Sequence, residues 1–83
     1  MKMDFITFRS ITPAQRGQRL LQQNGIGASI QRTPRWMEEQ GCGYCLRLRE
    51  QDLQLACQLL RQANVPFSKV FVWQGEKLQE MPL

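Results

Sequence analysis

The hydrophobic period of this chain changes along its length, and these changes constrain the fold most strongly. Stretches in which apolar and polar residues alternate, which is typical of β-strands, are separated by stretches with helical spacing. The expected strands are residues 3–9, 26–32, 44–49 and 67–73, and the expected helices are residues 12–24 and 52–63. The resulting order is β-α-β-β-α-β, two similar halves in succession.

This order predicts an α+β fold of the ferredoxin-like type. Right-handed crossovers would place both helices on one face of a four-stranded antiparallel sheet, with the first and third strands adjacent at its centre. The length of 83 residues suits one domain. We expect residues 1–74 to form that domain and the polar residues 75–83 to form a flexible C-terminal tail.

The first helix has clear boundary signals. Thr12 can cap it, Pro13 suits the first helical position, and Gln15 completes a capping-box pattern. Gly17 lies inside the helix, where we expect it to allow close approach to the sheet. Gly25 predicts the left-handed residue that ends the helix.

Composition excludes several classes of protein. A hydrophobic fraction of 42% is that of a folded chain, and a net charge of +4 is mild: it permits anionic partners but does not indicate nucleic-acid binding. No apolar run approaches the ~20 residues of a membrane span, and the N-terminal stretch does not resemble a signal peptide. Three cysteines, an odd number, argue against paired disulfides. We therefore expect a cytoplasmic protein with free thiols and without a membrane partner.

The most chemically distinctive stretch is residues 41–45. Cys42 lies between Gly41 and Gly43, which would give a partner access to the thiol and supply unusual backbone angles. Nothing else in the sequence offers comparable chemistry, because the chain has no histidine. Cys42 is therefore either a reactive thiol or a small residue at a tight turn.

The predicted topology supplies surroundings for Cys42. The start of the third strand should lie beside the end of the first, near Arg9 and Ser10, and close to the first helical turn at Thr12. Free backbone N–H groups near residues 12–14 and the side chain of Arg9 would stabilise the thiolate and lower the pKa of Cys42.

The other cysteines are weaker candidates. Positions three apart in a strand face opposite sides, so Cys45 does not converge with Cys42 and is at most a resolving thiol. Cys57 lies on the apolar face of the second helix, which indicates a structural role. One Cys-x-x-Cys pair without histidine cannot by itself supply the four ligands of a structural zinc site, so only a site shared by two chains could bind zinc. We expect neither a metal nor a cofactor.

Four short segments carry a resemblance to a known family: residues 8–12, 25–26, 33–35 and 41–43. Over residues 5–73 the chain resembles the selenium/sulfur carrier protein-like family of small bacterial proteins. The resemblance implies that Cys42 carries sulfur or selenium as a persulfide or selenopersulfide, received from a donor protein and passed to an acceptor protein. The chain departs from the family pattern at Cys45, where a small residue without a thiol is usual.

A second hypothesis concerns the sheet face without helices. Arg47, Arg49, Phe71 and Trp73 would lie there and could bind a protein, an anionic ligand or a second copy of the chain. The Gly43-Tyr44 pair lacks the basic residue that an RNA-recognition motif requires, so nucleic acid is not expected. Without histidine, a carrier or binding module is favoured over an enzyme.

The loop before Gly41 contains Trp36 and Met37. This pair could form a flap over Cys42, an anchor for a partner, or a segment that folds back on the chain's own core.

Overall fold

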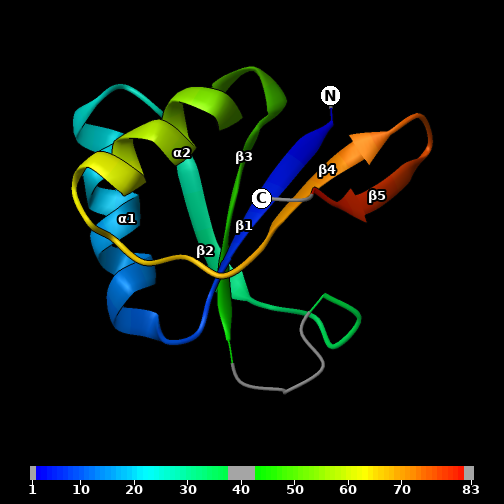
Figure 1. Ribbon diagram of the computed structural model, residues 1–83, viewed down its shortest axis with the longest axis horizontal. Helices are drawn as coiled ribbons and strands as arrows, with labels where there is room; N and C mark the ends of the chain where they lie inside the picture. Colours follow the sequence, from blue (N-terminus) through cyan, green and yellow to red (C-terminus); the bar gives the residue numbers. More distant parts are fainter. Residues whose placement is uncertain (1, 38–42, 82–83) are drawn as a thin grey trace.

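A computed structural model describes residues 2–37 and 43–81. Within these residues the chain forms two α-helices, a short 3-10 helix and strands that join one sheet (Figure 1). The elements are β1 Met3–Phe8, α1 Ile11–Gln23, β2 Ala28–Arg32, β3 Tyr44–Arg49, η1 Glu50–Asp52, α2 Leu53–Gln62, β4 Val70–Gln74 and β5 Lys77–Glu80. The chain is therefore α+β, as the sequence predicts.

The sheet is antiparallel, with the strand order β2-β3-β1-β4-β5. The predicted central pairing of the first and third strands is confirmed, since Met3 pairs with Arg49 and Phe8 pairs with Tyr44. The prediction of a four-stranded sheet is corrected, because β5 adds a fifth strand at the edge beside β4.

Strand β5 lies in the stretch that its composition marks as a tail. A two-residue loop joins it to β4, with Gln74 paired to Lys77. Gly75 adopts a φ of +64°, which this tight reversal requires. The strand was missed because its residues are mostly polar and exposed, so they show no apolar alternation.

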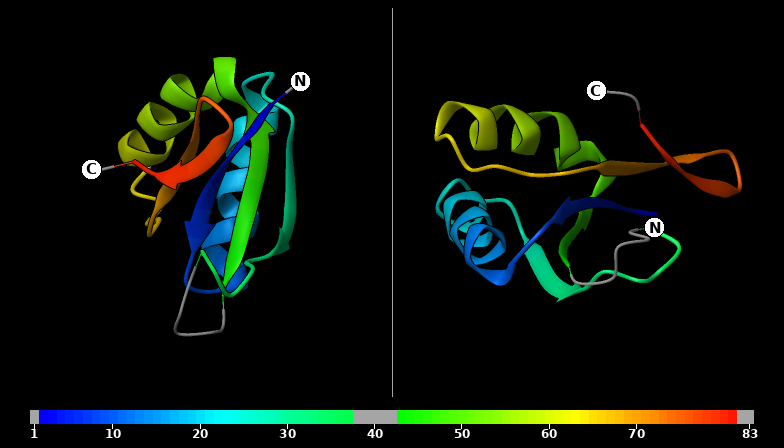
Figure 2. Two further views of the ribbon diagram at one scale, coloured as in Figure 1. Left: turned by 90° about the vertical axis from the view of Figure 1, so that its right-hand side faces the viewer. Right: turned by 60° about the horizontal axis from the view of Figure 1, so that its bottom comes forward.

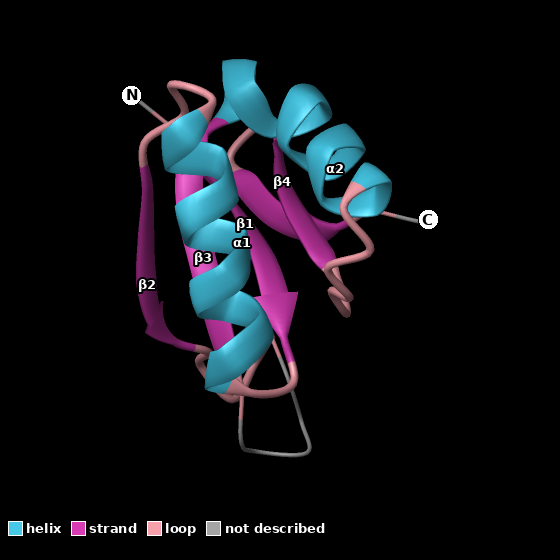
Figure 3. Ribbon diagram, turned by 90° about the vertical axis from the view of Figure 1, so that its left-hand side faces the viewer, coloured by secondary structure: helices cyan, strands magenta, loops and turns pink. Residues whose placement is uncertain are grey.

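Both helices cover the same face of the sheet (Figure 3), and the opposite face is seen in the left view of Figure 2. The core between helices and sheet includes Ile6, Phe8, Leu46, Leu48, Leu21, Leu60 and Val70, all buried. A Cβ atom on Gly17 would lie 3.1 Å from Cδ2 of Leu60 and 3.3 Å from Cζ of Phe8. Gly17 therefore allows close approach, as expected, to α2 as well as to the sheet.

Helix α1 begins earlier than the capping pattern predicts. Ser10 is the N-cap, with extended φ and ψ of −146° and 169°, and Ile11 is the first helical residue. Thr12 is therefore inside the helix, and no side chain caps its start. Pro13 remains acceptable there, because the first N–H groups of a helix have no intrahelical partner to lose.

The two helices end in the same way. Gly25 has a φ of +79°, as predicted, and the N–H of Ile26 donates to the Leu21 carbonyl at 2.9 Å. At the end of α2, Asn64 has a φ of +57° and the N–H of Val65 donates to the Leu60 carbonyl at 2.9 Å. Both endings are Schellman motifs, in which a left-handed residue stops the helix.

The linker of residues 63–69 joins α2 to β4. It includes Phe67, which the alternation assigned to the fourth strand; that strand begins instead at Val70. The linker is attached to β1, since the N–H of Ser68 donates to the Thr7 carbonyl at 2.7 Å. The N–H of Thr7 donates to the Lys69 carbonyl at 2.8 Å.

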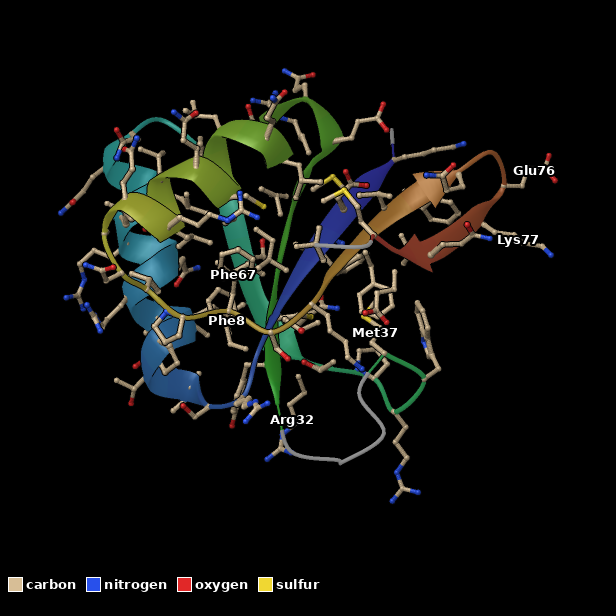
Figure 4. The ribbon with its side chains drawn as sticks, viewed as in Figure 1. Phe8, Arg32, Met37, Phe67, Glu76 and Lys77 are labelled. Atoms are coloured by element: carbon tan, nitrogen blue, oxygen red, sulfur yellow. The ribbon has the colours of Figure 1, made fainter. Side chains whose placement is uncertain are left out.

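The face without helices carries a second group of buried residues, which we call the outer cluster: Thr7, Met37, Cys45 and Phe71. Met37 is 3% exposed and is directed from its loop toward the strands (Figure 4). The ring of Trp36 packs edge-on against Phe71, with centroids 5.7 Å apart. Residues 33–37 thus fold back on the sheet, the third of the three roles considered for Trp36 and Met37.

Candidate thiol site at the start of β3

Cys42 and Gly41 lie outside the described residues, and Gly43 is the first described residue after them. A Cβ atom on Gly43 would lie only 2.8 Å from the backbone oxygen of Phe8. The Gly43 carbonyl accepts a hydrogen bond of 3.0 Å from the N–H of Thr33. Gly43 is therefore required for space, because a side chain at this position would meet the backbone of β1.

The predicted neighbourhood of this strand start is confirmed for its described residues. Tyr44 pairs with Phe8, so the chain enters β3 beside the point where β1 leaves the sheet. Arg9 and Ser10 follow β1 directly, and both are exposed. The end of β1, the start of α1 and the start of β3 lie together at the bottom of Figure 1.

Sequence reasoning missed one basic residue at this end of the molecule. Arg32 is the last residue of β2 and pairs with Tyr44. Its side chain is exposed, and its guanidinium lies 5.6 Å from the centroid of the Tyr44 ring (Figure 4). The sequence feature that could have identified Arg32 is its position at the end of an alternating strand, directly before Thr33-Pro34.

The start of α1 is the positive end of a helix. Its first turn contains no acidic residue and its N-cap makes no side-chain hydrogen bond. The N–H groups of Ile11 and Thr12 precede the first intrahelical bond, whereas Pro13 has no N–H to offer. The free donors are therefore those of Ile11 and Thr12, which begin one residue earlier than the group predicted at residues 12–14.

The two described thiols are both free and buried. Cys45 is 0% exposed, and burial raises its pKa. Cys57 is 5% exposed; burial raises its pKa too, and the charge of Arg61 opposes this. Both thiols therefore remain protonated at neutral pH. Cys57 lies in the main core, as the sequence indicates.

The residues expected on the face without helices are there, but most of them are engaged. Arg47 is exposed, and Arg49 forms an ion pair of 3.3 Å with Asp52. Phe71 is buried beside Trp36. The indole N–H of Trp73 donates to the Met3 carbonyl at 2.8 Å.

Among residues 2–37 and 43–81, no group of three or more Cys, Asp, Glu or His side chains could hold a metal ion. Neither helix in residues 2–37 and 43–81 is long and apolar enough to cross a membrane.

The comparison with protein families gives one match. Residues 4–72 match the family described as "Putative Se/S carrier protein-like". The chain belongs to this family. The match spans both helices and β1 to β3, includes residues 41–43, and ends before β5. No curated protein and no solved structure shows significant similarity to the chain.

Proposed function

We propose that this Se/S carrier family member carries a sulfur or selenium atom on the thiol of Cys42, as a persulfide or selenopersulfide. The observation that carries the proposal is the family match over residues 4–72, a range that contains Cys42. The protein acts as a carrier between a donor protein and an acceptor protein rather than as a stand-alone enzyme.

The choice of Cys42 rests on the other two thiols. A thiol that exchanges sulfur with another protein must be accessible and must ionise, because the thiolate is the nucleophile. Cys45 and Cys57 are buried and burial raises the pKa of each, so they meet neither requirement. Cys42 is the remaining cysteine of the chain.

The charges at this end of the molecule support a thiolate. Cys42 is bonded to Gly43, and consecutive Cα atoms are only about 3.8 Å apart. Gly43 lies at the end of the sheet that carries Arg9, Arg32 and the positive end of α1. Nearby positive charge favours the ionised form of a thiol and lowers its pKa.

The transfer itself requires no catalytic histidine. The Cys42 thiolate attacks the terminal sulfur of a persulfide on the donor. The donor's S–S bond breaks, the donor leaves as a thiolate, and a new S–S bond forms on Cys42. A thiolate on the acceptor then attacks the same terminal atom and releases Cys42 as a thiolate. Each step is a thiol–disulfide type exchange without net oxidation, and selenium can take the place of the transferred sulfur.

A second candidate function is supported by one observation on the face without helices. Trp36 is 59% exposed beside the buried Phe71, and the exposed Arg47 lies on the same sheet face. Such a pairing of aromatic and basic groups suits a protein or anionic partner, including a second copy of the chain. Trp36→Ala and Arg47→Glu would weaken that binding, whereas Cys42→Ser would leave it unchanged.

The carrier proposal is tested by intact-mass measurement after incubation with a cysteine desulfurase and cysteine. We expect the wild type and Cys45→Ser to gain the mass of one sulfur atom, and Cys42→Ser to gain none. A dithiol reductant should reverse the gain. If Cys42→Ser gains sulfur as readily as the wild type, the proposal is wrong.

A further inference from the structure

Three adjoining hollows lie along the linker of residues 63–69, on the side of the molecule that carries the helices. The largest, about 640 Å³, is lined by Leu60, Arg61 and residues 64–67. A second, about 350 Å³, lies between Arg9 and residues 66–68. The third, about 230 Å³, lies between α1 and the linker at residues 63 and 65. Because Pro66 and Phe67 line the first two, they form a ridge between them.

This ridge is held at both ends. On one side, the N–H of Val65 donates to the Leu60 carbonyl, and Val65 is 4% exposed. On the other side, Ser68 and Lys69 bond to Thr7 of β1, and the Thr7 hydroxyl accepts from the Lys69 N–H at 2.8 Å. A surface that is already ordered loses little conformational entropy when a partner binds.

Each hollow contains arginine and none is lined by an acidic residue. Arg61 lines the largest, Arg9 lines the second, and Arg16 and Arg19 line the third. None of these four arginines forms an ion pair with a residue in the described part of the chain. The described acidic residues lie at the start of β1, in η1 and in the β4–β5 hairpin: Asp4, Glu50, Asp52, Glu76 and Glu80.

The charge is therefore divided between two regions of the molecule. The hairpin with Glu76 is at the right of Figure 4, whereas the linker and α1 are at the left. Arg9, Arg16 and Arg19 share none of these hollows with an acidic residue, and Arg61 lines a hollow with Glu50 only at a separate place, beside η1 and the start of α2. Arginines without ion-pair partners attract carboxylates and disfavour basic partners.

Apolar side chains form part of these walls. Leu60 and Val65 belong to the main core, and Phe67 and Leu20 are half-buried against it. The guanidinium of Arg61 lies 5.6 Å from the centroid of the Phe67 ring. Aromatic residues and arginine are both enriched in protein interfaces relative to the rest of the surface.

We propose that these three hollows dock a short acidic segment of a partner protein. Its carboxylates would pair with Arg9, Arg16 and Arg61, and one aliphatic or aromatic side chain would pack beside Phe67. A peptide fits better than a nucleic acid, because the Arg61 guanidinium lies over the Phe67 ring, the only aromatic ring among the described residues lining these hollows, where a base would have to stack. This docking does not depend on the chemistry of Cys42.

The test uses a library of short random peptides displayed on phage and selected against the full chain. We expect the enriched peptides to contain several Asp or Glu residues and one Leu, Phe or Trp. A synthetic copy of one such peptide is then titrated by fluorescence anisotropy. Its affinity should fall as salt rises. In amide chemical-shift mapping, it should perturb residues 60–68 and the exposed face of α1.

Matched variants locate the binding. Arg16→Glu should lower the affinity for the peptide about 10-fold, and Arg61→Glu should lower it at least as much. Each change replaces an attractive charge with one that repels the carboxylates of the peptide. Arg47→Glu makes the same charge change on the opposite sheet face and should alter affinity less than about 2-fold. Arg16 is exposed on α1, so Arg16→Glu tests the surface without disturbing the Arg61–Phe67 contact.

Other results would overturn the proposal. These are enriched peptides that are basic or uncharged, equal binding by Arg16→Glu and the wild type, or shifts confined to the face without helices. Tighter binding of a single-stranded oligonucleotide at this surface, or dimerisation of the chain through it, would also contradict it. The Cys42→Ser variant should bind the peptide as the wild type does. Failure of sulfur transfer and failure of docking are therefore distinguishable.

Discussion

The two faces of the sheet bury side chains in different ways. One face is covered by α1 and α2, whose apolar faces pack on a continuous core. The other is covered only in part: Met37 of the loop at residues 33–37 is buried there, and Trp36 packs against Phe71. A helix places several side chains on one contact surface, whereas a loop covers the sheet with only one or two side chains. The helix-covered face should therefore contribute most of the free energy of unfolding. The outer cluster should open locally before the main core does.

The largest effect is expected in the main core. Leu46 is 0% exposed between the sheet and α1, so Leu46→Ala removes its packing and leaves a cavity. We expect a loss of about 3 kcal/mol in the free energy of unfolding, measured by chemical denaturation. A loss equal to or smaller than that from Met37→Ala would contradict the proposed difference between the faces.

The next effect is expected at Gly43, where β3 enters the sheet. Gly43→Ala places a methyl group 2.8 Å from the Phe8 carbonyl oxygen, which the backbone must move to relieve. We expect a loss of about 2 kcal/mol in unfolding free energy. Gly27→Ala is the matched control, because nothing lies within 4 Å of its added Cβ and its φ is not positive. That control should be neutral within about 0.5 kcal/mol.

A smaller effect is expected in the outer cluster. Met37→Ala should cost about 1–2 kcal/mol, at or below the low end for buried methionines, because a loop can collapse around the missing side chain. It should also increase the rate at which Cys45 is alkylated in the native protein, since the outer cluster opens locally. Cys57, in the main core, should stay protected. Equal acceleration at both cysteines would mean that the two faces open together.

The smallest effect on stability is expected from a buried carboxyl group in the sheet, that of Asp4, rather than from packing. Asp4 is 3% exposed and one of its carboxylate oxygens has no hydrogen-bond partner. Burial raises the pKa of Asp4; the backbone N–H of Trp73 opposes the rise and the charge of Glu50 adds to it. Folding therefore favours the protonated form, and ionisation of Asp4 lowers stability as the pH rises through its folded pKa.

The variant Asp4→Asn should accordingly be more stable than the wild type at neutral pH. The gain should shrink as the pH falls toward the unfolded pKa of ~3.9, where the wild-type carboxyl is protonated in both states. Thermal melts at neutral and acidic pH measure this, with the exposed Glu76→Gln as a control. A difference that stays constant with pH would contradict the assignment to Asp4 ionisation.

The elements that sequence reasoning identified are those in which local signals and packing agree. The apolar positions of α2, from Leu53 to Leu60, are buried as their spacing predicts. The left-handed Gly25 follows from the same kind of local signal. The start of α1 was placed slightly late, since Ser10 and Thr12 are both acceptable caps and neighbouring residues decide between them.

For the candidate site, the sequence alone predicted which residues would carry the chemistry. It contains three thiols and no histidine, and the thiol between two glycines precedes an alternating strand. The strand order that places the start of β3 beside the end of β1 also followed from the sequence, because short connections and handedness leave few alternatives.

Only the tertiary structure decided that Cys45 is fully buried and where basic groups gather. Cys45 belongs to the outer cluster on the face without helices, and the position of Arg32 depends on strand register. The pairing of β5 rests on the reversal at Gly75 and the edge of β4, and the hollows beside Phe67 require a linker bonded to Thr7. These features come from contacts between residues far apart in the chain. Such contacts produce no hydrophobic periodicity that could be recognised in the sequence.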